Sequence, residues 1–235
     1  MTTTLVTGSN KGLGYETARK LIAAGHTVYV GARDPERGRE AAERLGARFV
    51  QLDVTDDASV AAAAKAIEAD GGLDVLVNNA GIEGRTPGNR IIGPADETAG
   101  HMAALFDTNV FGIVRMMHAF LPLLQRSAAP VVVNLSSGLS KTADLADPDG
   151  PVHFYPGVAY PASKTAVNMV TVQYAKAFPG IKINAVDPGY TATDLNGGTG
   201  TQTVDEGAAI IVAMAQADPD GPTGGYFAAS GPVAW

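Results

Sequence analysis

The sequence contains no cysteine, so disulfide bonds, thiolate metal sites and a cysteine nucleophile are excluded. Its four histidines show no metal-ligand spacing, and we predict no metal site. The net charge of −7 argues against a nucleic-acid-binding protein. No apolar run approaches the roughly 18 residues that a membrane-spanning helix needs, and no signal peptide is evident. We therefore expect a soluble, cytoplasmic protein without a membrane partner.

The chain is rich in apolar and small residues instead. It has 235 residues, of which 46% are hydrophobic and only 17% are charged, so it is long and apolar enough for one large α/β domain with a buried core. The 28 glycines are scattered and therefore indicate turns and close-approach points rather than a linker. No break in composition and no internal repeat divides the chain, so we expect residues 1–235 to form a single domain.

Strand-like and helix-like segments alternate from the start of the chain. The predicted strands are 3–7, 28–30, 48–52, 74–78, 131–135, 181–186 and 225–229, and the predicted helices are 13–24, 36–45, 58–69, 96–106, 107–126, 161–177 and 205–216. This alternation predicts a doubly wound parallel sheet with helices on both faces. The apolar runs 75–77 and 131–133 are typical of strands that are buried on both sides.

A glycine-rich segment, Thr7-Gly8-Ser9-Asn10-Lys11-Gly12-Leu13-Gly14, joins the first predicted strand to the first helix. Glycines let the backbone approach a pyrophosphate, and the helix N-terminus offers free N–H groups and a positive dipole end. The spacing is GxxxGxG, not the GxGxxG of the general dinucleotide fingerprint. By itself the segment is either a structural turn or a phosphate-binding turn, and its position favours the second.

The second predicted strand ends in Ala32-Arg33-Asp34-Pro35. At this place an acid bonds the ribose 2′-hydroxyl of NAD, whereas an arginine accommodates the 2′-phosphate of NADP. Asp34 has a structural alternative, because an aspartate before a proline can cap a helix. That alternative leaves Arg33 for the ribose, with Lys11 as a second positive charge, and favours NADP(H) over NAD(H).

Polar and small residues follow the next three predicted strands. Asp53 either accepts a hydrogen bond from an adenine amino group or caps the next helix. Asn79-Ala80-Gly81 follows the fourth strand, and Ser136-Ser137 follows the fifth. These strand ends meet at the carboxyl edge of a parallel sheet, where ligands bind. Asn109 lies in a helical pattern, where a polar residue is usually solvated or capping.

The stretch Tyr160-Pro161-Ala162-Ser163-Lys164 places a phenol and an ammonium four residues apart. If Pro161 opens a helix, both side chains lie on one face, one turn apart. A tyrosine is a poor acid at neutral pH because its reference pKa is about 10, and a nearby cation lowers that pKa. The pair is then able to exchange a proton with a substrate oxygen. The alternative is an ordinary surface turn of helix.

The motifs TGSNKGLG, LDV, NNAG, NLSSG, YPASK and PGYTATD occur in the order of the short-chain dehydrogenase/reductase (SDR) family, and the chain resembles this family from Leu5 to about Phe227. The glycine spacing is the one that this family uses. The Asn10-Lys11 pair and the strand end at Arg33 are most similar to its NADPH-dependent carbonyl reductases. The resemblance implies a Rossmann-type sheet with strand order 3-2-1-4-5-6-7 and an oxidoreductase that acts on a ketone, an aldehyde or a secondary alcohol.

The resemblance also implies a catalytic set of Asn109, Ser137, Tyr160 and Lys164. In the family, the tyrosine protonates the carbonyl oxygen and the second serine of the motif, Ser137 rather than Ser136, binds that oxygen. The lysine binds the nicotinamide ribose and lowers the tyrosine pKa, and the asparagine supports a water chain to the lysine. The residues implied to contact the cofactor are Gly8, Asn10, Lys11, Gly12, Leu13, Gly14, Arg33, Asp53, Val54, Asn79, Ala80, Gly81, Tyr160, Lys164, Pro188, Gly189, Thr191 and Thr193.

Two segments depart from the family pattern. Tyr160 follows Ser137 by 23 residues, a longer gap than usual. Loops of this length inside a domain are usually functional or mobile, so we expect 138–157 to wall the substrate pocket. Longer inserts there accompany loss of the usual dimer contact, which leaves monomer and homo-oligomer both open. Within 190–203 we expect a short, flexible lid over a permissive site.

The leading hypothesis is therefore an NADPH-dependent reductase for a small-molecule carbonyl substrate. One alternative is a sensor that binds the cofactor without catalysis, although a sensor has no need of the proton donor Tyr160. Another is an elimination on the same fold, which would consume no nicotinamide. The sequence does not name the substrate, because the fold does not fix it.

Overall fold

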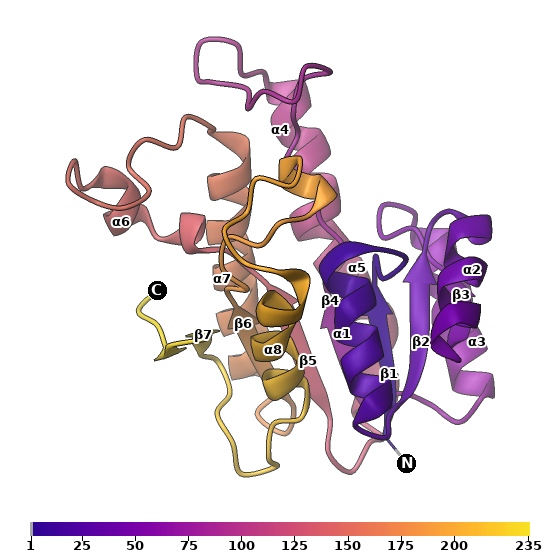
Figure 1. Ribbon diagram of the computed structural model, residues 1–235. Helices are drawn as coiled ribbons and strands as arrows, with labels where there is room; N and C mark the ends of the chain where they lie inside the picture. Colours follow the sequence, from indigo (N-terminus) through magenta and orange to yellow (C-terminus); the bar gives the residue numbers. More distant parts are fainter. Residues whose placement is uncertain (1) are drawn as a thin grey trace.

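The computed structural model describes residues 2–235, whose strands and helices alternate as predicted (Figure 1). The strands are β1 (Thr3–Thr7), β2 (Thr27–Ala32), β3 (Arg48–Gln51), β4 (Val75–Asn78), β5 (Val131–Leu135), β6 (Lys182–Val186), β7 (Tyr226–Ala228) and β8 (Gly231–Pro232). The α-helices are α1 (Gly12–Ala23), α2 (Pro35–Leu45), α3 (Asp57–Ala69), α4 (Ala99–Phe106), α5 (Gly112–Leu124), α6 (Thr142–Ala146), α7 (Ala159–Ala177) and α8 (Val204–Ala215). Short turns of other helix types are η1 (Asp107–Phe111), η2 (Gly138–Ser140) and η3 (Asp194–Asn196).

The strands form one sheet in the order β3-β2-β1-β4-β5-β6-β7-β8. The first seven strands are parallel and confirm the predicted order, whereas the short β8 runs antiparallel to β7. This eighth strand was not predicted, because two residues are too few to give a pattern. The strand order reverses between β1 and β4, and ligands bind outside the carboxyl ends of strands at such a point.

Helices cover both faces of the sheet, as predicted. α1, α2 and α8 lie on one face, and α3, α5 and α7 lie on the other (Figure 1). All residues of β4 and β5 are buried, as expected for strands covered on both sides. One core cluster includes Phe120 of α5, and the cluster on the opposite face includes Leu21 of α1 and Ile211 of α8.

Three boundaries near the carboxyl edge differ from the prediction. α7 begins at Ala159 rather than at Pro161, whose missing N–H is tolerated in a first helical turn. The stretch expected as two helices is one run from α4 to α5, interrupted by the π-helical turn η1. Such turns often occur at functional sites. The segment 138–157, expected to be a loop, contains η2 and α6.

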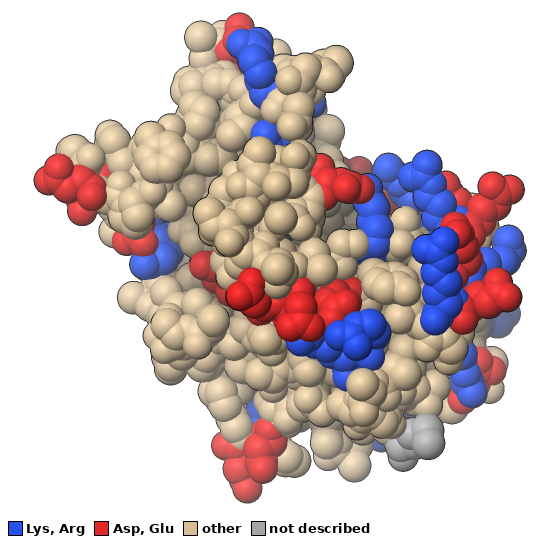
Figure 2. Space-filling model, viewed as in Figure 1, with Lys and Arg blue, Asp and Glu red and all other residues tan. Residues whose placement is uncertain are grey.

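Charged side chains are unevenly spread over the surface. On the face shown in Figure 2 they gather over α2 and between α1 and α8, where Glu16, Arg19, Lys20 and Asp205 form ion pairs. The segment 190–203 carries mostly uncharged side chains on this face. Within residues 2–235, no helix combines the length and apolar character needed to cross a membrane, and no group of three His, Cys, Asp or Glu side chains is arranged to hold a metal ion.

Candidate active site

The glycine turn, residues 8–14, connects β1 to α1 at the carboxyl edge of the sheet. Gly8 and Gly12 have φ values of 63° and 58°, which favour glycine. A Cβ on Gly14 would lie 2.7 Å from the Gly8 carbonyl oxygen and would also collide with the Asn79 amide, so the tight turn requires glycine there. The N-cap residue of α1, Lys11, gives no side-chain cap within the described chain. The first N–H groups of α1 are therefore placed to receive an anion.

The residues that follow β4 support this turn. The Asn79 side-chain amide donates to the carbonyl oxygens of Thr7 at 2.7 Å and Gly8 at 3.2 Å. The Thr7 hydroxyl accepts hydrogen bonds from the backbone N–H groups of Asn79 and Ala80 at 3.0 and 2.9 Å. The Leu13 side chain is partly buried and packs against the core cluster that includes Leu21 and Ile211.

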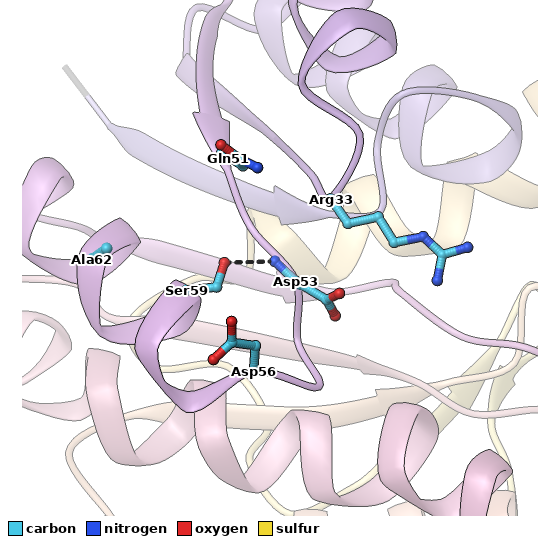
Figure 3. Close-up of a pocket in the computed structure, with 6 residues that line it drawn as sticks. All are labelled: Arg33, Gln51, Asp53, Asp56, Ser59 and Ala62. Atoms are coloured by element: carbon cyan, nitrogen blue, oxygen red, sulfur yellow. Dashed lines mark hydrogen bonds between the residues drawn. The ribbon is translucent and has the colours of Figure 1, made fainter.

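A cavity of about 390 Å³ opens where β2 and β3 end, lined by Arg33, Gln51, Asp53, Asp56, Ser59 and Ala62 (Figure 3). Asp34 caps α2, as predicted, because its carboxylate accepts from the N–H groups of Glu36 and Arg37 at 3.0 and 3.1 Å. The Arg33 guanidinium makes no hydrogen bond or ion pair with any of residues 2–235 and points away from the sheet (Figure 3). The Arg33 guanidinium is thus available to a ligand at this strand end, whereas the Asp34 carboxylate is not.

Asp53 does not cap α3, so that alternative was wrong: Asp56 caps the helix by accepting from the Ala58 N–H at 2.9 Å. The Asp53 carboxylate instead accepts from the N–H and the hydroxyl of Thr55 at 2.9 and 2.7 Å. Burial opposes its ionisation, but these hydrogen bonds and the charge of Arg33 lower the pKa of Asp53 overall. Val54, predicted to lie against adenine, is only 7% exposed and packs under Gly112.

α7 presents Tyr160 and Lys164 together, as the spacing predicts. The Lys164 Nζ lies 5.5 Å from the centre of the Tyr160 ring. It donates to the Leu135 carbonyl oxygen at the end of β5 at 2.7 Å. Burial lowers the pKa of Lys164 to about 8, although the Asp187 carboxylate acts in the opposite direction.

The pKa of Tyr160 is raised rather than lowered. Burial is the largest cause, and the negative charge of Glu83 is the next. A hydrogen bond with Ser137 lowers the pKa but does not offset these effects. The expectation of a lowered Tyr160 pKa was wrong for this arrangement, in which the Lys164 ammonium is directed at the Leu135 carbonyl. The phenol is held in its protonated form, which is the form that donates.

The two serines after β5 occupy different environments. Ser136 is 3% exposed and its hydroxyl donates to the Asn168 side-chain oxygen at 2.6 Å. Ser137 is half-buried, hydrogen-bonds Tyr160 and accepts from the Leu139 N–H at 3.2 Å. Only the second serine therefore stands beside Tyr160.

Asn109 lies in the π-helical turn and is 1% exposed. Its side-chain oxygen accepts from the Ile82 N–H at 2.8 Å, and its amide donates to the Ile82 carbonyl at 2.9 Å and to the Ser163 hydroxyl at 3.0 Å. Asn109 thus ties the segment after β4 to α7. A Cβ on Gly81 would lie 3.4 Å from the Asn109 oxygen and 3.7 Å from the Lys164 Nζ, so both groups flank Gly81.

The segment 190–203, which was predicted to be a lid and is called the lid below, is folded back on itself rather than extended. The Gln202 side chain donates to the Pro188 carbonyl and to the Thr191 hydroxyl, and the Ala192 N–H donates to the Gln202 carbonyl at 2.9 Å. Thr191 is only 4% exposed as a result. The lid also reaches the glycine turn, because Lys11 pairs with Asp194 at 2.7 Å and Gly12 lies next to Thr193. Lys11, predicted as a second positive charge, is therefore already paired.

The sequence analysis missed one charged group near Tyr160. Glu83 belongs to the segment between β4 and α4, to which no role was assigned, and its side chain is 7% exposed. No motif marks this position. The only available signal was an acidic residue two positions after NNAG in a region of strand ends.

The model of the short chain dehydrogenase family matches residues 2–203, which include every residue predicted to lie in the site. The chain is 32% identical to (+)-neomenthol dehydrogenase from Capsicum annuum, over 95% of this chain and 94% of that protein. The structure of NADPH-bound carbonyl reductase from chicken fatty liver has a TM-score of 0.86 at 29% identity and covers 99% of this chain and 98% of that one. A gluconate 5-dehydrogenase from Burkholderia cenocepacia, in complex with NADP and tartrate, has a TM-score of 0.82 at 28% identity and covers 97% of this chain and 92% of that one.

Proposed function

Because the chain belongs to the short chain dehydrogenase family, we propose that it is an NADP(H)-dependent oxidoreductase that reduces a small ketone or aldehyde and, in reverse, oxidises the secondary alcohol. The observation that carries this proposal is the meeting of Ser137, Tyr160 and Lys164 at the carboxyl edge of β5. The likeness to an NADPH-bound carbonyl reductase supports it.

The proposed dinucleotide site fits the residues at the carboxyl edge. The glycine turn and the start of α1 would hold the pyrophosphate, since their N–H groups lack a side-chain cap in residues 2–235. Arg33 would hold the 2′-phosphate, because it makes no hydrogen bond or ion pair with residues 2–235, whereas Asp34 is engaged as a cap. Asp53 and Val54 would lie by the adenine, Asn79 by the neighbouring ribose, and the segment from Pro188 to Thr193 by the carboxamide. The cofactor supplies the hydride when it is bound.

The chain's own part in the reaction is to hold the carbonyl and give it a proton. Ser137 would hydrogen-bond the carbonyl oxygen, and Tyr160, kept protonated by its surroundings, would donate its phenolic proton to that oxygen. Lys164 presents an ammonium one turn along α7 and would bind the nicotinamide ribose. Asn109 would fix the relative position of α7 and the segment after β4.

The test is NADPH oxidation over a panel of aldehydes, ketones and quinones by the wild type, Tyr160→Phe and Tyr174→Phe. We expect turnover by the wild type and a fall of about 10²- to 10⁴-fold in kcat for Tyr160→Phe, the range that general acid catalysis contributes. Tyr174 lies on the same helix, away from the site, and its variant should retain activity.

The binding of NADPH, followed by fluorescence, separates the possible outcomes. Turnover that persists in Tyr160→Phe would contradict the proposed role of the phenol. Tight NADPH binding without turnover of any carbonyl would instead favour a cofactor-sensing protein.

A further inference from the structure

The segment between β4 and α4 forms a short hairpin at the carboxyl edge. Arg85 pairs with Ile91 in an antiparallel bridge, and the Thr86 N–H donates to the Arg90 carbonyl at 2.9 Å. Asn89 at the tip, with φ 59°, lies directly against Gly197 of the lid. The hairpin therefore contacts one of the two loops that were predicted to surround the substrate.

Glu83 at the base of this hairpin links it to the other loop. One carboxylate oxygen accepts from the Tyr155 hydroxyl at 2.9 Å, and the other accepts from the Arg85 Nε at 2.6 Å. The side chains of Glu83 and Arg85 are 7% and 16% exposed. A buried carboxylate is tolerated only when its charge and its hydrogen-bonding capacity are satisfied, and here both oxygens are.

Tyr155 lies five residues before Tyr160, in the segment that leads into α7. Its ring lies over Gly157, where a Cβ would come within 2.7 Å of the ring and 3.0 Å of Ile91. Glu83, Tyr155 and Tyr160 line the same space, which is too narrow to admit a water molecule. The bond between Glu83 and Tyr155 therefore ties the segment that leads into α7 to the hairpin, beside the proposed acid.

We propose that Glu83 is a positioning residue of the active site, which fixes the segment leading into α7 through Tyr155 and thereby the location of the Tyr160 hydroxyl. The inference rests on the proposed function only in that Tyr160 is the acid there. Tyr155 and Arg85 are the partners through which Glu83 acts, and none of the three is proposed to touch the reacting carbon.

The charge of Glu83 gives it a second effect on Tyr160. The titratable groups around Tyr160 come from every element packed against it and are Glu83, Glu97, His101, Tyr155, Lys164, Asp187 and Tyr226. Beyond burial, which raises the pKa of Tyr160 most, Glu83 is the largest charge effect and acts in the same direction. It therefore helps to keep the phenol protonated, as carbonyl reduction requires.

Two variants separate the positional effect from the charge effect. Tyr155→Phe removes the hydrogen bond and keeps the negative charge. Glu83→Gln removes the charge and keeps a side-chain oxygen that Tyr155 can bond. Glu16→Gln is the matched control, because Glu16 is a similarly buried carboxylate that binds an arginine, Arg19, on α1.

Amide hydrogen exchange tests the positional effect without any substrate. We expect exchange in residues 150–160 to speed up about tenfold in Tyr155→Phe, the loss that follows removal of a hydrogen bond to a charged group. The same residues should exchange at the wild-type rate in Glu16→Gln. Wild-type exchange in Tyr155→Phe would overturn the inference, whether or not the protein reduces carbonyls.

The pH profile of kcat/KM for NADPH-dependent reduction of the best carbonyl found tests the charge effect. The alkaline limb that Tyr160 sets, which lies above the titration of Lys164 near pH 8, should move to lower pH by about one unit in Glu83→Gln, since loss of a neighbouring negative charge lowers a pKa by about 1–3 units. The limb should stay in place in Tyr155→Phe, whose KM for the carbonyl substrate should rise. An unmoved limb in Glu83→Gln would overturn the proposed effect of the Glu83 charge on Tyr160. The proposed function would still stand in that case, because the wild type would still reduce the carbonyl.

Discussion

The proposed cofactor side and the proposed substrate side of this site are built by different means. On the cofactor side, short stretches of chain suffice: the glycine turn has two positive φ values within five residues, and Asp34 caps the helix that follows it directly. On the substrate side, side chains join segments far apart, such as Tyr155 and Glu83, which are 72 residues apart. The first side is specified locally, whereas the second depends on a few long-range contacts.

Lys164 lies where the two sides meet, and it should give the largest effect. Its folded-state pKa of about 8 lies below the ordinary value of 10.5, so the unfolded chain binds more protons between these pH values. Stability must therefore rise with pH across this window. We expect the free energy of unfolding of the wild type, relative to Lys164→Met, to rise by about 2–3 kcal/mol between pH 7 and pH 10.

Urea unfolding of both proteins across this pH range measures the difference directly. The comparison with Lys164→Met cancels the titration of groups that both proteins share. Parallel stability curves would mean that Lys164 is not desolvated in the folded state.

Gly14→Ala should disturb the cofactor side alone. The new methyl group would collide with the backbone of Gly8 and with Asn79, and overpacking of this kind costs about 1–3 kcal/mol. We expect lower NADPH affinity by fluorescence titration together with a lower unfolding midpoint. Gly180→Ala is the control, because a Cβ there meets nothing within 4 Å and φ is not positive. An unchanged NADPH affinity in Gly14→Ala would show that the turn does not hold the cofactor.

Arg33→Ala should change cofactor choice without changing stability. Loss of a charge-assisted hydrogen bond to the 2′-phosphate should lower the ratio of kcat/KM for NADPH to that for NADH by roughly 10- to 100-fold. Arg44→Ala removes a paired arginine on α2 and should leave the ratio unchanged. If both variants keep the wild-type ratio, Arg33 does not bind the phosphate.

The exposed pair between Lys11 and Asp194 should have the smallest effect, because its side chains are 59% and 78% exposed. Asp194→Asn frees Lys11 for the cofactor and should raise NADPH affinity by a factor of about two to three, an effect that salt suppresses. Lys11→Met should lower the affinity by a similar factor. Changes in the same direction in both variants would contradict a competition for Lys11.

The sequence predicted the strands and helices because alternating apolar runs and glycine stops are local signals, whereas the sheet order followed from the resemblance to the family. It also predicted the cap at Asp34, since a proline at the first helical position marks that geometry. The meeting of Tyr160 and Lys164 followed from helical spacing, even though the helix begins two residues earlier than expected.

Long-range and irregular features could not be predicted in this way. The π-helical turn around Asn109 has no periodic signal, and the two-residue β8 is too short for one. The raised pKa of Tyr160 depends on burial first and on the charge of Glu83 next, and only folding brings either about. The LDV motif alone does not tell whether Asp53 caps α3. In the structure Asp56 is the cap, and the Asp53 carboxylate accepts from Thr55 instead.

The most direct test of the central claim is a reduction with NADPH that carries deuterium at the transferred position of the nicotinamide C4. Mass spectrometry of the alcohol from the best carbonyl substrate should find one deuterium at the carbinol carbon for each NADPH consumed, because the hydride passes directly to the carbonyl carbon. A product without deuterium, or product formed without consumption of NADPH as in an elimination, would contradict the account.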